Sequence, residues 1–205
     1  SLGLGIALSH SPTMYRPRNA WNDIYRQLVG DTPQPNRAAI ETEEVLDEYA
    51  GRIETALGTL RAEINDYKPD VILAVVSDRR RMFDETQVPQ IHIYIGNDIW
   101  GSTVYPNLGE EGSISDIVNI PCHAALAGFL AEELTWAGYD LNISRMKFTP
   151  QGDPEGGVGQ NLTDPILRLV PTLDIPIVPI HINAHVNPAI SGHRMAPFGK
   201  SIANV

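Results

Sequence analysis

The chain has 205 residues, 42% of them hydrophobic and 20% charged, a composition typical of a globular protein with one domain spanning residues 1–205. Its formal net charge of −10 argues against a nucleic-acid partner, because binding to phosphates depends on clustered positive charge. No segment approaches the ~20 apolar residues of a membrane span, no secretory signal is recognisable, and the single cysteine excludes an intramolecular disulfide. We therefore expect a cytoplasmic protein without a membrane or nucleic-acid partner.

The chain begins with an apolar segment, residues 2–8, which we predict to be a strand that ends in a polar turn carrying His10. The next segment, residues 15–36, is rich in Pro, Arg and Asn, and apolar residues at helical spacing between Trp21 and Leu28 predict a short helix within it. This segment is either a packed surface loop or a lid over a pocket.

The longest amphipathic pattern covers residues 37–66, where apolar side chains recur every three or four positions, and Lys68-Pro69-Asp70 ends this predicted helix. Residues 71–76 are then apolar without interruption, a pattern typical of a strand buried on both faces in the middle of a parallel sheet. Strand, helix and strand together predict a right-handed βαβ crossover.

Polar residues follow the strand of residues 71–76 directly. In open α/β sheets, ligands bind at the carboxyl ends of the strands, so Asp78 and Arg79 are candidate substrate-binding residues beside His10. The planar fork of an arginine matches a carboxylate. The alternative is that Asp78 caps a turn and residues 79–81 form a solvated arginine patch.

Further elements are predicted along the second half of the chain. Strands are expected at residues 87–96, 140–148 and 174–185, helices at 121–137 and 162–170, and loops at 97–120 and 150–161. The alternation predicts an α/β fold with a mostly parallel central sheet and helices on both faces.

Two of these strands carry histidines, which are potential metal ligands. His92 is interpreted as structural or solvent-facing. His181 and His185 share a face of the last predicted strand, but at roughly 13 Å apart on a straight strand they cannot bind one ion.

Four segments together resemble the class III extradiol ring-cleavage dioxygenases, the family of the protocatechuate 4,5-dioxygenase beta subunit and the gallate and methylgallate dioxygenases. They are residues 5–12, residues 69–83, the predicted helix with its following turn at 123–141, and residues 177–202. The resemblance implies a non-heme Fe(II) enzyme that cleaves a catechol-type aromatic acid with O2. It also implies that His10 is an iron ligand.

The same resemblance shows departures from the family. Arg79 occupies the position of the second iron-binding histidine and cannot ligate a metal. The family's base histidine and carboxylate ligand lie beyond Val205, so the C-terminal third of the family is missing, and we expect a homo- or hetero-oligomer that covers the gap. No catalytic residue is assigned.

Three functions remain open at this point. The first is a ring-cleaving dioxygenase, or a subunit of one, that is completed by a further segment or a partner. The second is a non-catalytic paralogous subunit or binding module that has lost the metal triad. The third is a fold reused for another reaction, with His10, Asp78 and the arginines around an anionic substrate. We take the first as the prediction.

Overall fold

The computed structural model describes residues 3–30, 32–78, 82–83, 87–105, 108, 110, 112–113, 116–145 and 157–205. The α-helices are α1 (Trp21–Val29), α2 (Pro35–Ile40), α3 (Glu43–Tyr67), α4 (Ala124–Trp136), α5 (Gln160–Leu169) and α6 (Gly192–Asn204). The strands are β1 (Ile72–Ser77), β2 (Ile91–Tyr94), β3 (Asp98–Ser102), β4 (Ile117–Pro121), β5 (Asn142–Ser144) and β6 (Ile177–Ile182), and two short 3-10 helices, η1 (Pro12–Tyr15) and η2 (Arg18–Ala20), precede α1.

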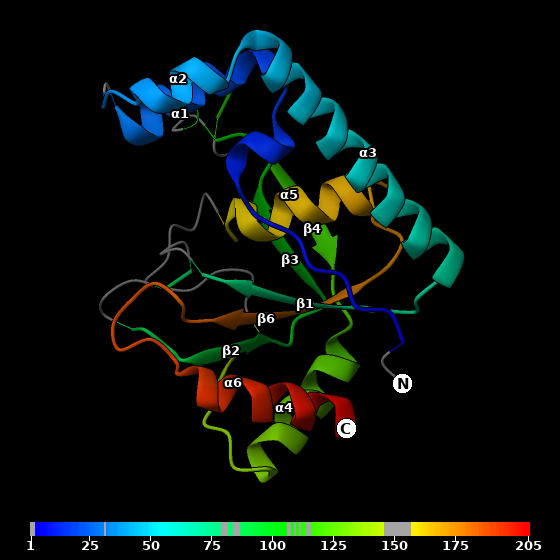
Figure 1. Ribbon diagram of the computed structural model, residues 1–205. Helices are drawn as coiled ribbons and strands as arrows, with labels where there is room; N and C mark the ends of the chain where they lie inside the picture. The colour runs from blue at the N-terminus through cyan, green and yellow to red at the C-terminus, as the bar shows by residue number, and fades with distance from the viewer. Residues whose placement is uncertain are drawn as a thin grey trace.

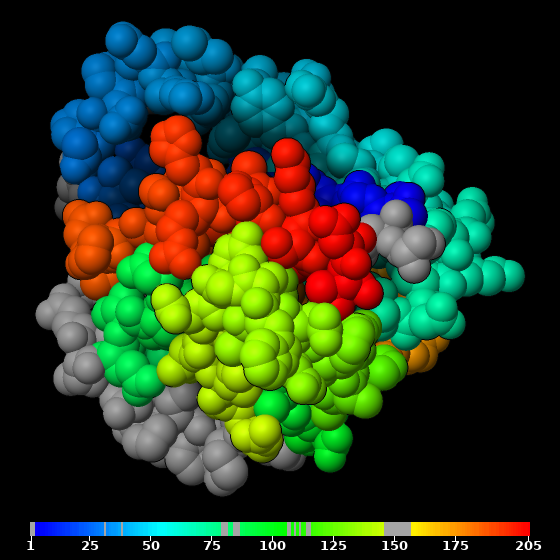
Figure 2. Space-filling model, turned by 90° about the horizontal axis from the view of Figure 1, so that it is seen from below, coloured from blue at the N-terminus to red at the C-terminus, as the bar shows by residue number. Residues whose placement is uncertain are grey.

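The four-stranded sheet has the order β1-β6-β2-β5 and is sandwiched between two helical layers, with α3 and α5 on one face and α4 and α6 on the other (Figure 1). β1 pairs with β6 and β2 with β5 in parallel, whereas β2 and β6 are antiparallel. Figure 2 shows α4 and α6 side by side over the lower face. The predicted α/β fold, with its mostly parallel sheet and helices on both faces, is confirmed.

The predicted position of the strand of residues 71–76 is wrong. β1 lies at the edge of the sheet, and Val75 is 54% exposed. The two inner positions belong to β6 and β2, all residues of which are buried. An uninterrupted apolar run indicates that both faces of a strand are covered by apolar neighbours. It does not indicate the order of the strands, because that order depends on how distant segments pair.

The long helices form where the sequence pattern and the end signals agree. The Thr42 side chain caps α3 by accepting a hydrogen bond from the Val45 amide, and α3 ends where Lys68 adopts a left-handed conformation with φ 53°. α4 begins similarly, with His123 Nδ1 accepting from the Leu126 amide. Gly138, with φ 91°, follows the end of α4.

Three parts of the chain differ from the prediction. Residues 3–10 are extended but are not assigned as a strand, because Leu4, Ile6 and Leu8 pack against buried residues of α3 instead of pairing within the sheet. The expected loop at residues 97–120 contains the antiparallel pair β3 and β4. The segment after β6 contains α6, which the sequence pattern did not indicate.

Two apolar clusters hold the layers together. The first joins the α5 face of the sheet to the β3–β4 pair through Ala74, Leu162 and Ile99, among others. The second joins the opposite face to α4 and α6 through Ile180, Leu130 and Phe198. Within the part of the chain that the structure describes, no helix has the length and apolar character needed to cross a membrane.

Candidate functional site

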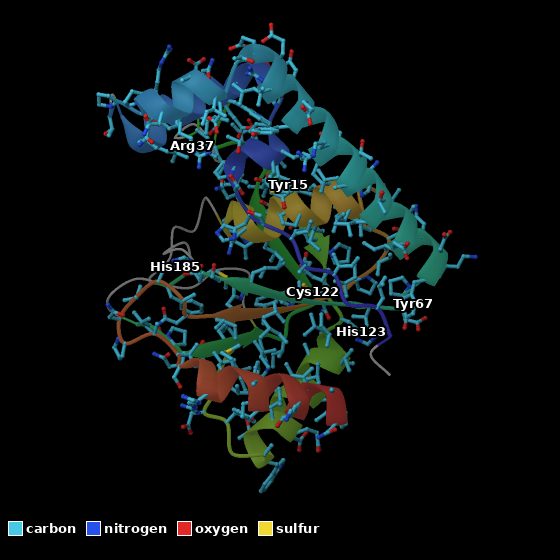
Figure 3. All side chains as sticks on the ribbon, viewed as in Figure 1. Tyr15, Arg37, Tyr67, Cys122, His123 and His185 are labelled. Carbon is cyan, nitrogen blue, oxygen red and sulfur yellow. The ribbon has the colours of Figure 1, made fainter. Side chains whose placement is uncertain are left out.

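A serine and a histidine meet at the carboxyl end of the parallel pair β1 and β6. Ser77 is the last residue of β1 and pairs in register with Ile182, the last residue of β6. The loop after β6 brings His185 back to this point, and its Nε2 lies 3.0 Å from Ser77 Oγ. Ser77 is half-buried and His185 is exposed at the end of the sheet (Figure 3). A hydroxyl and an imidazole in this geometry can exchange a proton.

Asn183 holds the loop that carries His185. Its side chain is buried, and its Oδ1 accepts hydrogen bonds from the backbone amides of His185 at 3.3 Å and Val186 at 3.0 Å. Its Nδ2 donates to the carbonyl oxygens of Val186 at 2.7 Å and Pro188 at 3.3 Å. These four contacts fix the backbone on both sides of the imidazole, so the position of His185 is set by a buried amide.

Asp78, a predicted substrate-binding residue, closes the turn that follows β1. Its two carboxylate oxygens accept hydrogen bonds from the backbone amides of Met82 at 3.0 Å and Phe83 at 3.1 Å. This is the turn-capping role that the sequence left as the alternative. Asp78 also borders a cavity of about 10 Å³, lined in addition by His181 and Asn183, which has room for about one water molecule. A role of Asp78 toward a substrate stays a prediction.

The interior of the sheet contains a chain of three polar side chains. His92 Nδ1 lies 3.1 Å from His181 Nδ1, and His92 Nε2 lies 2.8 Å from Ser144 Oγ. Burial lowers the pKa of His181 to about 4, and burial together with repulsion from His181 lowers the pKa of His92 well below its usual value. His92 is fully buried, so the structural interpretation is correct and the solvent-facing one is wrong.

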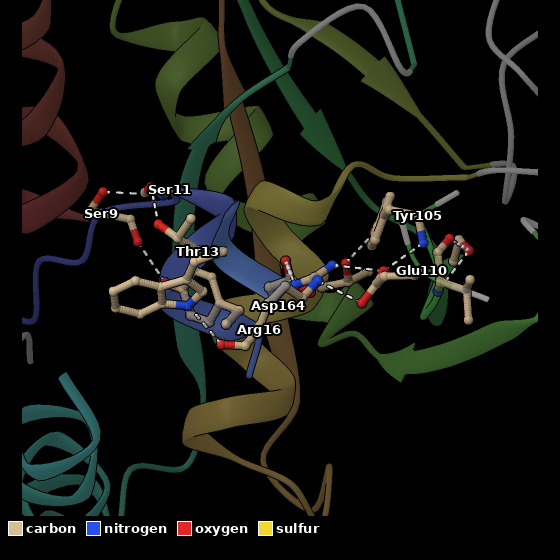
Figure 4. Close-up of polar contacts among 12 residues, drawn as sticks. Ser9, Ser11, Thr13, Arg16, Tyr105, Glu110 and Asp164 are labelled. Atoms are coloured by element: carbon tan, nitrogen blue, oxygen red, sulfur yellow. Dashed lines mark hydrogen bonds and ion pairs between the residues drawn. The ribbon is translucent and has the colours of Figure 1, made fainter. Parts of the chain in front are cut away.

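A buried ionic cluster lies near the start of α5 (Figure 4). The Arg16 side chain, only 5% exposed, contacts Asp164 with Nη1 at 2.6 Å and Glu110 with Nε at 2.6 Å. Its guanidinium also lies over the Tyr105 ring, and the Tyr105 hydroxyl hydrogen-bonds to Thr163 at 2.6 Å. Burial, which outweighs the attraction of Arg16, raises the pKa of Asp164 to about 6. Arg16 is 94 residues from Glu110 and 148 residues from Asp164 in the sequence, so no local motif indicated this cluster.

The remaining predicted site residues are His10 and Arg79. His10 is half-buried in the extended segment before η1, where the Tyr15 hydroxyl donates to the Ser9 carbonyl at 2.6 Å. Among the residues that the structure describes, no group of three or more His, Cys, Asp or Glu side chains could hold a metal ion. Iron binding by His10 stays a prediction, and Arg79 lies outside the described residues.

Comparison with known proteins gives little similarity. The sequence matches no family model and no curated protein sequence. The fold overlaps with a solved structure from Weissella paramesenteroides that is assigned as a methylthioadenosine nucleosidase, with a TM-score of 0.41 and 10% sequence identity over 72% of this chain and 68% of that chain. An overlap of this extent carries no argument about activity.

These comparisons contradict the predicted dioxygenase family. No family model and no curated protein sequence supports the resemblance. The described residues also bring together no group that could form the expected iron site. The resemblance was wrong for a physical reason: each of its segments is a short strand or helix end followed by a turn, and such segments recur in many α/β folds. Ring cleavage of a catechol is therefore withdrawn as the function.

Proposed function

We propose that the chain is a serine-dependent hydrolase of small carboxylic esters, with Ser77 as the nucleophile and His185 as the general base. The observation that carries this proposal is the 3.0 Å contact between Ser77 Oγ and His185 Nε2. A serine hydroxyl is a weak nucleophile by itself and needs an adjacent base within hydrogen-bonding distance.

The position of the pair supports the proposal. It lies at the carboxyl end of a parallel strand pair, where open α/β sheets bind ligands. Both side chains are accessible, since Ser77 is half-buried and His185 exposed. The contacts of Asn183 hold the His185 loop, so the imidazole is positioned before a substrate arrives.

The reaction follows from the two side chains. As Ser77 Oγ attacks the carbonyl carbon of the ester, His185 Nε2 takes the hydroxyl proton. The tetrahedral intermediate collapses when the bond to the leaving alcohol breaks, and the protonated imidazole gives its proton to that alkoxide. A water molecule then attacks the acyl-serine with His185 again as base, releasing the carboxylic acid and restoring the hydroxyl.

Labelling with a fluorophosphonate probe and p-nitrophenyl acetate hydrolysis test the proposal. The probe is expected to form a covalent adduct on Ser77, located by peptide mass spectrometry. Ser77→Ala should abolish the adduct, and His185→Gln should lower the acetate hydrolysis rate by about 10²-fold or more, because general-base catalysis contributes about 10²–10⁴-fold.

Ser144→Ala is the matched control, because Ser144 also contacts a histidine but belongs to the buried chain of His92 and His181. Its labelling and hydrolysis rate should equal those of the wild type. An adduct on another serine, or hydrolysis that survives Ser77→Ala, would show that the Ser77–His185 contact is only structural.

A further inference from the structure

A second hollow lies away from the sheet edge and is lined by residues of the two 3-10 helices, the start of α1 and the first half of α3. Its volume is about 300 Å³, which is at the lower end of the range for small-molecule sites. Four of its lining residues are aliphatic, Met14, Pro17, Ala50 and Ile53, and the others are Arg16, Arg18, Trp21, Gly51 and Glu54, which is ion-paired with Arg168. The hollow therefore offers a small molecule both aliphatic side chains and charged groups.

Among the described residues, Arg18, on the wall of this hollow, forms ion pairs only with exposed side chains. The Arg18 side chain is 16% exposed, but its two ion-pair partners are surface side chains, Glu43 at 73% and Asp47 at 69% exposure. Arg18 Nη2 donates a hydrogen bond to Glu43 at 2.6 Å, whereas Arg18 Nε lies 3.3 Å from Asp47 and, like Arg16 Nε, forms no hydrogen bond with any residue that the structure describes. Exposed ion pairs contribute little to stability, so an incoming acceptor could displace these partners.

The other arginine on the wall has less exposed partners. Arg16 is ion-paired with Glu110 and Asp164, both largely buried, whereas both partners of Arg18 are exposed. The Trp21 ring is covered by the Arg18 guanidinium at 5.6 Å, which favours an aliphatic over a stacked aromatic ligand. The recognition elements are thus the Arg18 guanidinium, whose ion-pair partners are exposed, and the aliphatic side chains of the lining.

We propose that this hollow binds an aliphatic monocarboxylate, with the carboxylate on Arg18 and the chain along Met14 and Ile53. Arg binds carboxylates through paired N–H donors, which would also satisfy Arg18 Nε. A cavity of this size accommodates a chain of about six to ten carbons. The site does not involve Ser77 or His185, so the test of carboxylate binding is independent of the test of hydrolase activity.

A glycine on the cavity wall makes a sharp test possible. Gly51 lines the hollow, and a Cβ added there would meet no atom within 4 Å. Gly51→Leu therefore places a larger side chain in the hollow without replacing a charged group. Gly58→Leu is the matched control, because Gly58 lies two turns further along α3, is equally unobstructed and does not line the hollow. Both changes favour the helix, so neither should lower the melting temperature.

Isothermal titration calorimetry of the full chain with octanoate, 1-octanol and octylamine measures the binding. Octanoate is expected to bind to the wild type and to Gly58→Leu with equal Kd, and at least tenfold more weakly to Gly51→Leu and to Arg18→Gln. Octanol and octylamine should bind at least tenfold more weakly than octanoate. The proposal is overturned by no octanoate binding at millimolar concentration, by equal binding of octanol, or by binding that Gly51→Leu leaves unchanged.

Discussion

The buried histidines of the sheet make the free energy of unfolding depend on pH. The pKa of His181 falls from 6.5 in the unfolded chain to about 4 in the folded protein because of burial. Between these values the unfolded chain binds a proton that the folded chain does not, so stability is complete above pH 6.5 and is lost as the pH falls toward 4. His181 alone accounts for about 3 kcal/mol of this loss, and His92 acts in the same direction.

Urea unfolding at pH 7 and pH 4.5 measures this effect, and His181→Asn should reduce the difference between the two free energies. Asp164 acts in the opposite direction. Its pKa is raised to about 6, so its contribution to stability is present at low pH and is lost as the pH rises from 4 to 6. Asp164→Asn should therefore steepen the loss on acidification. Equal pH dependence in His181→Asn and the wild type would contradict this account.

At the scale of the elements, the same substitution should have opposite effects in a helix and in a strand. Gly58 lies inside α3 with free space around its missing side chain, so Gly58→Ala should stabilise the protein by about 1 kcal/mol through helix propensity. Gly101 in β3 faces α5, and a Cβ there would lie 2.5 Å from Thr163 Cγ2 and 2.8 Å from the Val158 carbonyl oxygen. Gly101→Ala should therefore destabilise it by about 1–3 kcal/mol.

Paired urea denaturation curves of these two alanine variants at pH 7 decide the point. The midpoint should rise for Gly58→Ala and fall for Gly101→Ala, with the same slope in both. A fall in both would mean that α3 is held by contacts that tolerate no methyl group at Gly58.

The elements themselves show what a sequence can and cannot predict. α1, α4 and α5 were predicted because each has a helical period that local packing satisfies. The β3–β4 pair was missed because its short segments have no clear alternation, and Gly101 weakens the strand pattern further. The Ser77–His185 contact spans 108 residues and depends on the register between β1 and β6. No local pattern encodes that register, although the sequence did indicate the strand end on which Ser77 lies.

Across the whole molecule, Arg16 connects segments that are far apart in the chain. It lies directly after η1 and reaches Glu110 in the segment before β4 and Asp164 in α5, so it ties the N-terminal region to the layer that covers β1. The oligomer expected from the sequence stays a prediction at this scale. The edge strand β1, where Val75 is exposed, is the surface at which an oligomer contact is best tested.

The Arg16 ion pairs should contribute far more to the free energy of unfolding than an ion pair of similar geometry on the surface. Arg16→Met leaves Asp164 buried without its counter-charge, and we expect a loss of about 3–5 kcal/mol in the free energy of unfolding at pH 7. Arg37→Met is the matched control, because Arg37 is 70% exposed and forms a helical pair with Glu41. That change should cost at most about 1 kcal/mol.

The double variant Arg16→Met/Asp164→Leu separates the ion pair from the packing of its aliphatic atoms. Because the buried carboxylate is removed along with its partner, the double variant should be more stable than Arg16→Met alone, and the two substitutions should be clearly non-additive. Urea unfolding of the wild type, Arg16→Met, Asp164→Leu and the double variant at pH 7 completes this cycle. If Arg16→Met costs no more than Arg37→Met, the cluster does not join the N-terminal region to α5 energetically, and the apolar contacts of Leu4, Ile6 and Leu8 with α3 must hold that region in place.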